Sequence, residues 1–286
     1  MDELKRVLVV GAGTMGSQIA LQTALSGRYD VTLVDAVAGQ LAKARAQNTR
    51  LLERSTQKGR LTEQQAKEAL ARITDSTDLQ AAAPQAELVI EAVIEDFDAK
   101  KGVFESLGKD AKKDAILASN SSTIAISRLA EFTGRPEACC NMHFFHPVTV
   151  MQLCEVVRGP KTNDATVEKA MSFVKSIDRT PVLLNKEIWG FIVNRILFAA
   201  SEEAMRLLEG GYASAEDIDI AVQKGLNWPM GPFHLLDFSG LDIFYGAMKD
   251  RHRQGEGDDA PELLRKLVED GHLGRKTGKG FFEYPK

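Results

Sequence analysis

The sequence predicts an α/β fold: an N-terminal doubly wound sheet with helices on both faces, followed by an all-helical C-terminal domain. Two observations carry this prediction. Apolar segments typical of buried strands alternate with helical segments through the first two thirds of the 286 residues. From Gly190 onward the apolar residues instead fall at helical spacing. We place the boundary near Lys186, which gives domains of residues 1–186 and 187–286.

The first strand, Val7 to Val10, is followed at once by the six residues Gly11, Ala12, Gly13, Thr14, Met15 and Gly16. In this pattern the first glycine allows a tight turn, and the second lets backbone approach a pyrophosphate. The third lets the next helix pack closely on the sheet. A glycine pattern alone is weak evidence, but here it follows a strand and opens a helix. The segment therefore predicts a Rossmann-type dinucleotide site.

Asp35 indicates which dinucleotide. It ends the second apolar strand, residues 31–34, near the offset of about 20 residues expected for a ribose-binding carboxylate. A carboxylate there accepts hydrogen bonds from the 2′- and 3′-hydroxyls and repels a 2′-phosphate. Residues 36–38 offer no arginine for that phosphate. We expect NAD rather than NADP; the alternative is a strand-end Asp that caps the next helix.

A helical hairpin is expected next, over about residues 40–71. Its helices are 40–58 and 62–71, with Thr62 as the N-cap, and the pair is longer than an ordinary crossover, which suggests an insertion with its own task. Strands are then expected at 87–93, 115–119 and 139–145, followed by 153–157 and 182–184, for which an antiparallel direction remains open. Polar residues follow the strands 87–93 and 115–119 at their carboxyl ends, where open α/β sheets bind ligands.

The second domain is expected to contain helices over residues 192–208, 214–224, 233–248 and 261–270. A domain of this size buries too little surface by itself. We therefore expect it to pack on a partner subunit, forming a homodimer through these helices.

Composition argues against several classes of protein. Lys plus Arg number 36 against 40 Asp plus Glu, which gives a formal charge of -4 and no basic field for nucleic acid. No apolar stretch has the length of a membrane span, and residues 1–5 lack signal-peptide features. Cys139, Cys140 and Cys154 show no paired metal spacing, which favours a reducing compartment. We expect a cytoplasmic protein with neither nucleic acid nor membrane as partner.

His143 is the candidate for acid–base chemistry. It lies at the predicted end of a strand, and Glu155 on the next strand is a plausible partner. A carboxylate bonded to one imidazole nitrogen fixes the tautomer and raises the basicity of the other. A structural histidine with a hydrogen-bonded ring is the commoner alternative. Metal binding by His143 and His146 lacks a third ligand at recognisable spacing, so we expect no metal site.

Two polar side chains are candidates for binding a substrate oxygen. Ser122 belongs to the polar run 120–123 behind the strand 115–119; an ordinary turn or helix cap is the alternative. Asn194 opens the second domain among largely apolar neighbours. A buried position that needs a polar partner is as consistent with this pattern as a solvated helix face.

Taken together, these segments resemble the L-3-hydroxyacyl-CoA dehydrogenases, and more narrowly the bacterial 3-hydroxybutyryl-CoA dehydrogenases. The likeness spans nearly the whole chain: the glycine loop and the segments 119–123, 143–145, 150–155, 190–195, 229–232 and 274–278. The resemblance implies an NAD-dependent enzyme that interconverts (S)-3-hydroxyacyl-CoA and 3-oxoacyl-CoA, with a short acyl chain.

The same resemblance implies roles for the candidate residues. His143 is the general base that takes the proton from the 3-hydroxyl as hydride leaves C3 for the nicotinamide, and Glu155 orients it. Ser122 and Asn194 bind the reacting oxygen or the thioester carbonyl. Contacts to the cofactor are implied for Glu95, Lys100, Ser122 and Lys276.

The resemblance also gives the hairpin a task, since this region meets coenzyme A in the family. Arg54, Lys58 and Arg60 are the cations expected to reach its phosphates. A solvated helix face is the alternative reading of these cations.

Two residues depart from the family pattern. His146 stands where the family has an Asn near the nicotinamide, so we expect a cofactor contact from the imidazole; Trp189 stands where the family has Pro. We expect these changes to mark an altered substrate rather than lost activity. The alternatives are a 3-hydroxy acid dehydrogenase for a substrate without CoA, such as carnitine or a sugar acid, and a non-catalytic NAD-binding protein.

Overall fold

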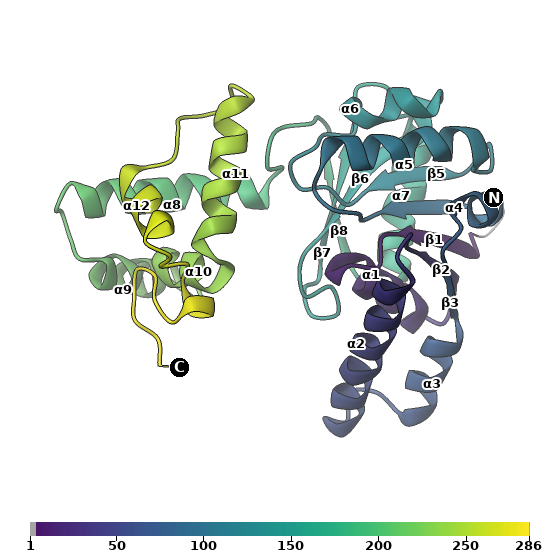
Figure 1. Ribbon diagram of the computed structural model, residues 1–286, viewed down its shortest axis with the longest axis horizontal. Helices are drawn as coiled ribbons and strands as arrows, with labels where there is room; N and C mark the ends of the chain where they lie inside the picture. The colour runs from purple at the N-terminus through teal and green to yellow at the C-terminus, as the bar shows by residue number, and fades with distance from the viewer. Residues whose placement is uncertain (1–3, 286) are drawn as a thin grey trace. The chain divides into compact units, whose positions relative to one another are not determined.

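The computed structural model describes residues 4–285, so the part of the signal-peptide argument that rests on residues 1–3 lies outside it. The chain divides after Phe191 into two compact units, Met1–Phe191 and Ile192–Lys286. The first contains one eight-stranded sheet in the order β3-β2-β1-β4-β5-β6-β7-β8 (Figure 1). The strands are β1 (Arg6–Val10), β2 (Asp30–Val34), β3 (Ile73–Ser76), β4 (Leu88–Glu91), β5 (Ile116–Ser119), β6 (Cys139–Phe144), β7 (Leu153–Arg158) and β8 (Thr180–Leu184).

Helices cover both faces of this sheet. One face carries α1 (Thr14–Leu25) and α7 (Asp164–Ser176). The other carries α4 (Leu79–Ala82), α5 (Phe97–Asp110) and α6 (Ser127–Ala130). Short 3-10 turns complete this unit: η1 (Ala83–Gln85), η2 (Glu131–Thr133) and η3 (Pro136–Ala138). Alternate residues of a strand point to opposite faces, so the central strands β1, β2, β4, β5 and β6 contribute to both cores. The predicted doubly wound fold is confirmed.

The predicted hairpin is present as α2 (Ala38–Gln57) and α3 (Glu63–Ala71), which lie side by side (Figure 1). Thr62 caps α3 as expected. Its hydroxyl accepts from the Gln65 N–H at 3.1 Å while the Gln65 side chain accepts from the Thr62 N–H at 2.9 Å. This reciprocal pair satisfies two of the N–H groups that a helix start leaves without partners.

The strands differ from the sequence-based expectation in two ways. β3 was not anticipated, because its sequence Ile-Thr-Asp-Ser is short and half polar. The segment predicted as a strand over 87–93 is shorter, ending at Glu91. The direction left open for the last strands is now defined: β7 runs antiparallel to β6, and β8 runs parallel to β7.

The second unit is helical: α8 (Val193–Glu209), α9 (Ala215–Leu226), α10 (Pro232–Ser239), α11 (Leu241–Arg253), α12 (Glu262–Glu269) and the turn η4 (Arg275–Thr277). The single helix expected over 233–248 is wrong. Gly240 interrupts it with φ 102, a conformation that ends one helix and starts another without the strain a side chain would cause.

Candidate active site

The glycine loop between β1 and α1 leaves open space where a phosphate would approach. A Cβ on Gly13 would meet no atom within 4 Å. A Cβ on Gly11, whose φ is 104, would meet the Ala92 carbonyl oxygen at 2.5 Å, and one on Gly16 would meet the Gly11 oxygen at 1.8 Å. The outer glycines are therefore required by packing, and the exposed middle one leaves the backbone accessible at the N-terminus of α1.

Asp35 follows β2 and points back to the glycine loop. Its Oδ2 accepts from the Ala12 N–H at 2.8 Å, and its Oδ1 from the Val37 N–H at 2.9 Å. Asp35 is not itself the N-cap of α2, which is Val37, but its Oδ1 bonds the N–H that immediately precedes that helix. Each carboxylate oxygen keeps acceptor capacity for a further donor.

His143 and Glu155 are brought together by the sheet. They are directly paired across the antiparallel strands β6 and β7, and Nδ1 of His143 lies 2.8 Å from Oε2 of Glu155. Glu155 is fully buried and His143 is 6% exposed. Because a carboxylate only accepts hydrogen bonds, it places the proton on Nδ1 and leaves Nε2 with a lone pair.

Two aromatic rings flank this imidazole. The centroid of the Phe145 ring lies 4.5 Å from that of His143, and the centroid of Phe191 lies at 5.5 Å. Phe191 is buried with φ 52, in the left-handed region where a side chain costs about 1–2 kcal/mol. The sequence did not predict the contact between Phe191 and His143. Phe191 directly follows Gly190, a residue type that marks turns, and this could have drawn attention to it. The rings restrict the imidazole and keep water from its faces.

Ser122 lies in the loop after β5, beside Glu95 in the loop after β4. The Glu95 Oε1 accepts from the Ser122 N–H at 3.0 Å and, more weakly, from its hydroxyl at 3.4 Å. Lys100 on α5 is buried and ion-paired with Glu95 at 3.3 Å. The structure thus brings together Ser122, Glu95 and Lys100. Glu91 completes this group, and sequence reasoning missed it.

The remaining candidates differ in how far they are exposed. His146 is exposed in the loop between β6 and β7, whereas Trp189 is buried. In the second unit, Asn194 lies half-buried in the first turn of α8. Lys276, on η4, is exposed and pairs with Asp242 at 2.5 Å.

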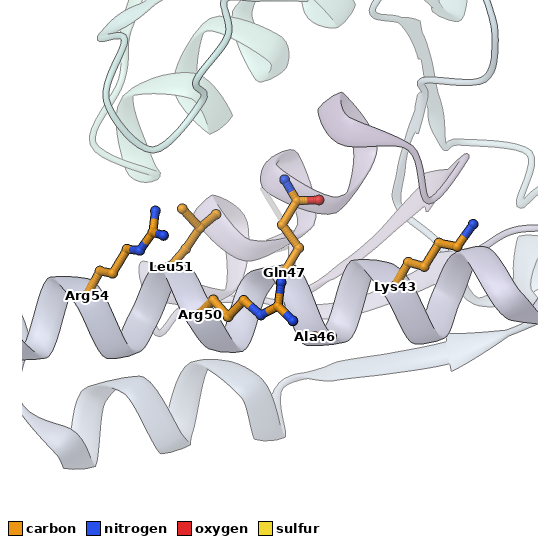
Figure 2. Close-up of a pocket in the computed structure, with 6 residues that line it drawn as sticks. All are labelled: Lys43, Ala46, Gln47, Arg50, Leu51 and Arg54. Atoms are coloured by element: carbon orange, nitrogen blue, oxygen red, sulfur yellow. The ribbon is translucent and has the colours of Figure 1, made fainter. Parts of the chain in front are cut away.

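The outer face of α2 is hollowed and basic. A hollow of about 480 Å³ is lined by Lys43, Ala46, Gln47, Arg50, Leu51 and Arg54. Figure 2 draws these six residues along α2. Arg54 was expected here, whereas Lys58 and Arg60 are exposed but not part of the lining. Sequence reasoning missed Lys43 and Arg50. Arg50 follows Lys43 by seven residues and precedes Arg54 by four, and residues at these spacings share one face of a helix. The sequence alone therefore contained the signal for this basic face.

The three thiols are structural. Cys139, Cys140 and Cys154 are buried and free. Burial raises the pKa of Cys139 to about 11 and raises the pKa of the other two thiols as well. Within residues 4–285, no group of three or more His, Cys, Asp or Glu side chains is arranged to hold a metal ion. No helix in the same range is long and apolar enough to cross a membrane.

Comparison with known proteins agrees with this geometry. The NAD-binding domain of 3-hydroxyacyl-CoA dehydrogenase matches residues 6–188, and the C-terminal domain of the same enzyme matches residues 190–284. The chain is 41% identical to a probable 3-hydroxybutyryl-CoA dehydrogenase of Deinococcus radiodurans, with 96% of this chain and 99% of the other covered.

Solved structures give the same picture. The (S)-3-hydroxybutyryl-CoA dehydrogenase of Ralstonia eutropha matches with a TM-score of 0.93 and 37% identity, over 99% of this chain and all of that one. A diketoreductase acting on dicarbonyl compounds matches with a TM-score of 0.89 and 33% identity, over 99% and 100% of the two chains. Both domain models match in order and cover nearly the whole sequence. The chain is therefore a member of the NAD-dependent 3-hydroxyacyl-CoA dehydrogenase family.

Proposed function

We propose that this protein interconverts short-chain (S)-3-hydroxyacyl-CoA and 3-oxoacyl-CoA with NAD, with His143 as the general base. The observation that carries the proposal is the buried pair of His143 and Glu155, whose nitrogen and oxygen lie 2.8 Å apart at the end of the sheet where ligands bind. This arrangement leaves Nε2 free to take a proton from a substrate hydroxyl.

In oxidation, Nε2 of His143 takes the proton of the 3-hydroxyl, and the imidazole becomes positively charged. Glu155 offsets that charge at 2.8 Å in surroundings that exclude water. The rings of Phe145 and Phe191 hold the imidazole plane in place. We assign Ser122 and Asn194 to the reacting oxygen or the thioester carbonyl, as donors that stabilise the developing charge.

The glycine loop and Asp35 fit NAD. The open space over Gly13 suits a pyrophosphate at the start of α1, and Asp35 accepts ribose hydroxyls with its remaining acceptor capacity. When bound, NAD supplies the acceptor for the hydride that leaves C3. We propose further cofactor contacts from Glu95, His146 and Lys276.

The basic hollow on α2 supports a CoA thioester rather than a free acid. Figure 2 shows Lys43, Gln47 and Arg54 directed to the same side of the helix. Guanidinium groups bind phosphate with paired hydrogen bonds, and CoA carries phosphates at a distance from its acyl group. We propose that Arg50 and Arg54 hold these phosphates, with Lys58 as a further contact beyond the hollow.

We also propose a homodimer formed by the helices of the second unit, in the cytoplasm. This unit exposes large apolar side chains in the single chain. They are Ile196, Tyr212, Ile220, Leu226, Phe238 and Ile243, each at least half exposed. Such a set on one small unit is typical of a surface that a second subunit covers.

A comparison of three substrates tests the proposal. Purified protein is mixed with NADH and with acetoacetyl-CoA, free acetoacetate or 3-dehydrocarnitine, and NADH absorbance is followed. We expect rapid oxidation with acetoacetyl-CoA and much slower oxidation with the two compounds without CoA. Preference for either of those compounds would instead support the dehydrogenase for a non-CoA substrate. Tight NADH binding without turnover of any 3-oxo compound would support the non-catalytic protein.

A further inference from the structure

Lys100 has a full set of partners inside the protein. The residue is 1% exposed, and its Nζ lies 2.7 Å from Oε1 of Glu91, 3.3 Å from Oε2 of Glu95 and 3.3 Å from the Val93 carbonyl oxygen. An ammonium group has three N–H donors. Two of them bond Glu91 and the Val93 carbonyl oxygen, and the ammonium forms an ion pair with Glu95. Buried among these acceptors, it is not exposed to a cofactor hydroxyl.

Glu91 is the fixed end of this arrangement. It is fully buried at the end of β4, where Oε1 also accepts from the Val93 N–H at 2.8 Å and Oε2 accepts from the Ser119 hydroxyl at 2.6 Å. Buried charges persist only when paired and hydrogen-bonded. Glu91 and Lys100 meet that condition together, and they form a neutral pair that anchors the second carboxylate.

Glu95 is that second carboxylate, and it holds the loop that contains Ser122. Its Oε1 accepts from the Ser121 hydroxyl at 2.5 Å, from the Ser122 and Thr123 N–H groups at 3.0 Å each, and from the Thr123 hydroxyl at 2.9 Å. The Ser122 hydroxyl makes only the long 3.4 Å contact. The backbone of Ser122 is therefore fixed, while its hydroxyl remains available to a ligand.

We propose that Lys100 is a positioning residue rather than a cofactor ligand: with Glu91 it keeps Glu95 ionised and in place, and Glu95 in turn positions Ser122. This inference rests on the proposed function, because it gives Glu95 and Ser122 their roles beside the nicotinamide and the substrate.

The charge on Glu95 depends on Lys100. Burial raises the pKa of the Glu95 carboxyl, but the Lys100 charge and the hydrogen bonds from Ser121 and Thr123 outweigh burial and leave the pKa below its usual value. Around Glu95, Glu91 lies on the far side of the ammonium and Asp96 caps α5 through the Ala99 N–H. The loop 121–123 brings only hydroxyl and N–H groups.

Removing the ammonium takes away one of the two effects that lower this pKa. Without Lys100, burial is opposed by hydrogen bonds alone, so the pKa of Glu95 rises and the carboxyl takes up a proton as the pH falls. An opposite charge at this distance typically accounts for about 1–3 pKa units. A protonated Glu95 no longer accepts hydrogen bonds from every donor of the loop 121–123. We therefore expect NADH binding to weaken at low pH.

The test uses Lys100→Met in a Glu91→Gln background, so that no buried charge is left unpaired. Dissociation constants of NADH are measured by fluorescence at about pH 5.5 and about pH 8. Circular dichroism confirms folding at both values. We expect the wild-type constants to agree, and those of E91Q/K100M to be at least about threefold weaker at the lower pH. Adding Glu95→Gln to that double variant removes the titrating group and abolishes the difference.

Equal weakening at both pH values, unaffected by Glu95→Gln, would overturn the inference and make Lys100 a direct ligand. Wild-type turnover of acetoacetyl-CoA is measured in parallel. Its absence would count against the proposed function, whereas the pH ratio of the variants reports on Lys100 alone.

Discussion

His143 and Glu155 occupy directly opposed positions on the antiparallel strands β6 and β7, with Nδ1 and Oε2 2.8 Å apart. The backbone ladder itself fixes this pair. Opposed residues of an antiparallel pair have Cβ atoms about 4.5–5.5 Å apart, and the carboxylate therefore needs no movement to reach the ring. The reversal of direction at β7 is thus part of how the site is built.

Glu155→Gln is expected to lower turnover while preserving the fold. Glutamine fills the same buried space and still offers an oxygen to Nδ1, but it lacks the charge that stabilises the imidazolium. We expect kcat to fall about tenfold or more, with the NADH dissociation constant unchanged. Glu87→Gln is a matched control, because Glu87 binds the start of β1, at the opposite end of the strands from His143. Loss of activity in both variants would show a general effect of carboxylate removal.

Asp35→Ser is expected to relax the preference for NADH over NADPH. The carboxylate that binds ribose hydroxyls also repels a 2′-phosphate, and serine removes that repulsion. The ratio of kcat/KM for the two cofactors, measured with acetoacetyl-CoA at saturation, should fall about tenfold or more. An unchanged ratio would mean that Asp35 does not lie against the adenosine ribose.

Arg50→Ala combined with Arg54→Ala is expected to raise KM for acetoacetyl-CoA about tenfold, with little change in kcat, because the lost contacts are remote from the reacting carbon. The effect should shrink with a truncated thioester that lacks the CoA phosphates. Added salt should mimic it in the wild-type protein. The control is Lys67→Ala on the exposed surface of α3. An equal increase in KM for the truncated thioester would show that Arg50 and Arg54 do not bind the CoA phosphates.

His146→Asn tests whether the exposed imidazole shapes substrate choice. Asparagine is smaller and cannot acquire charge. We expect relative kcat/KM values across a set of acyl-CoAs of different length and polarity to change by severalfold. Trp189→Pro offers a parallel test at a buried position. Identical relative values for His146→Asn and the wild type would remove His146 from the determinants of specificity.

Features encoded by neighbours along the chain could be predicted from the sequence. The glycine loop, Asp35 and the N-cap at Thr62 each depend on residues within one turn or one strand end. His143 and Glu155 could be paired in advance because both lie on consecutive strands.

Features assembled by the sheet could not be predicted in this way. The loop 119–123 meets Glu91 and Glu95 only because β4 and β5 are neighbours. Glu91 and Lys100 come from β4 and the following α5, and they pair because that helix packs back on the sheet. The left-handed conformation of Phe191 likewise depends on its packing against Val157 and Leu184. The break at Gly240 was missed because one glycine inside a helical pattern is ordinarily tolerated.

The account depends most on proton transfer by His143, and His143→Gln tests it directly. NADH-dependent reduction of acetoacetyl-CoA is measured for this variant and for His252→Gln, which alters an exposed histidine on α11. We expect kcat to fall at least about a hundredfold for His143→Gln, with NADH binding retained, and to stay near the wild-type value for His252→Gln. Near-normal turnover by His143→Gln would contradict the assignment of the base.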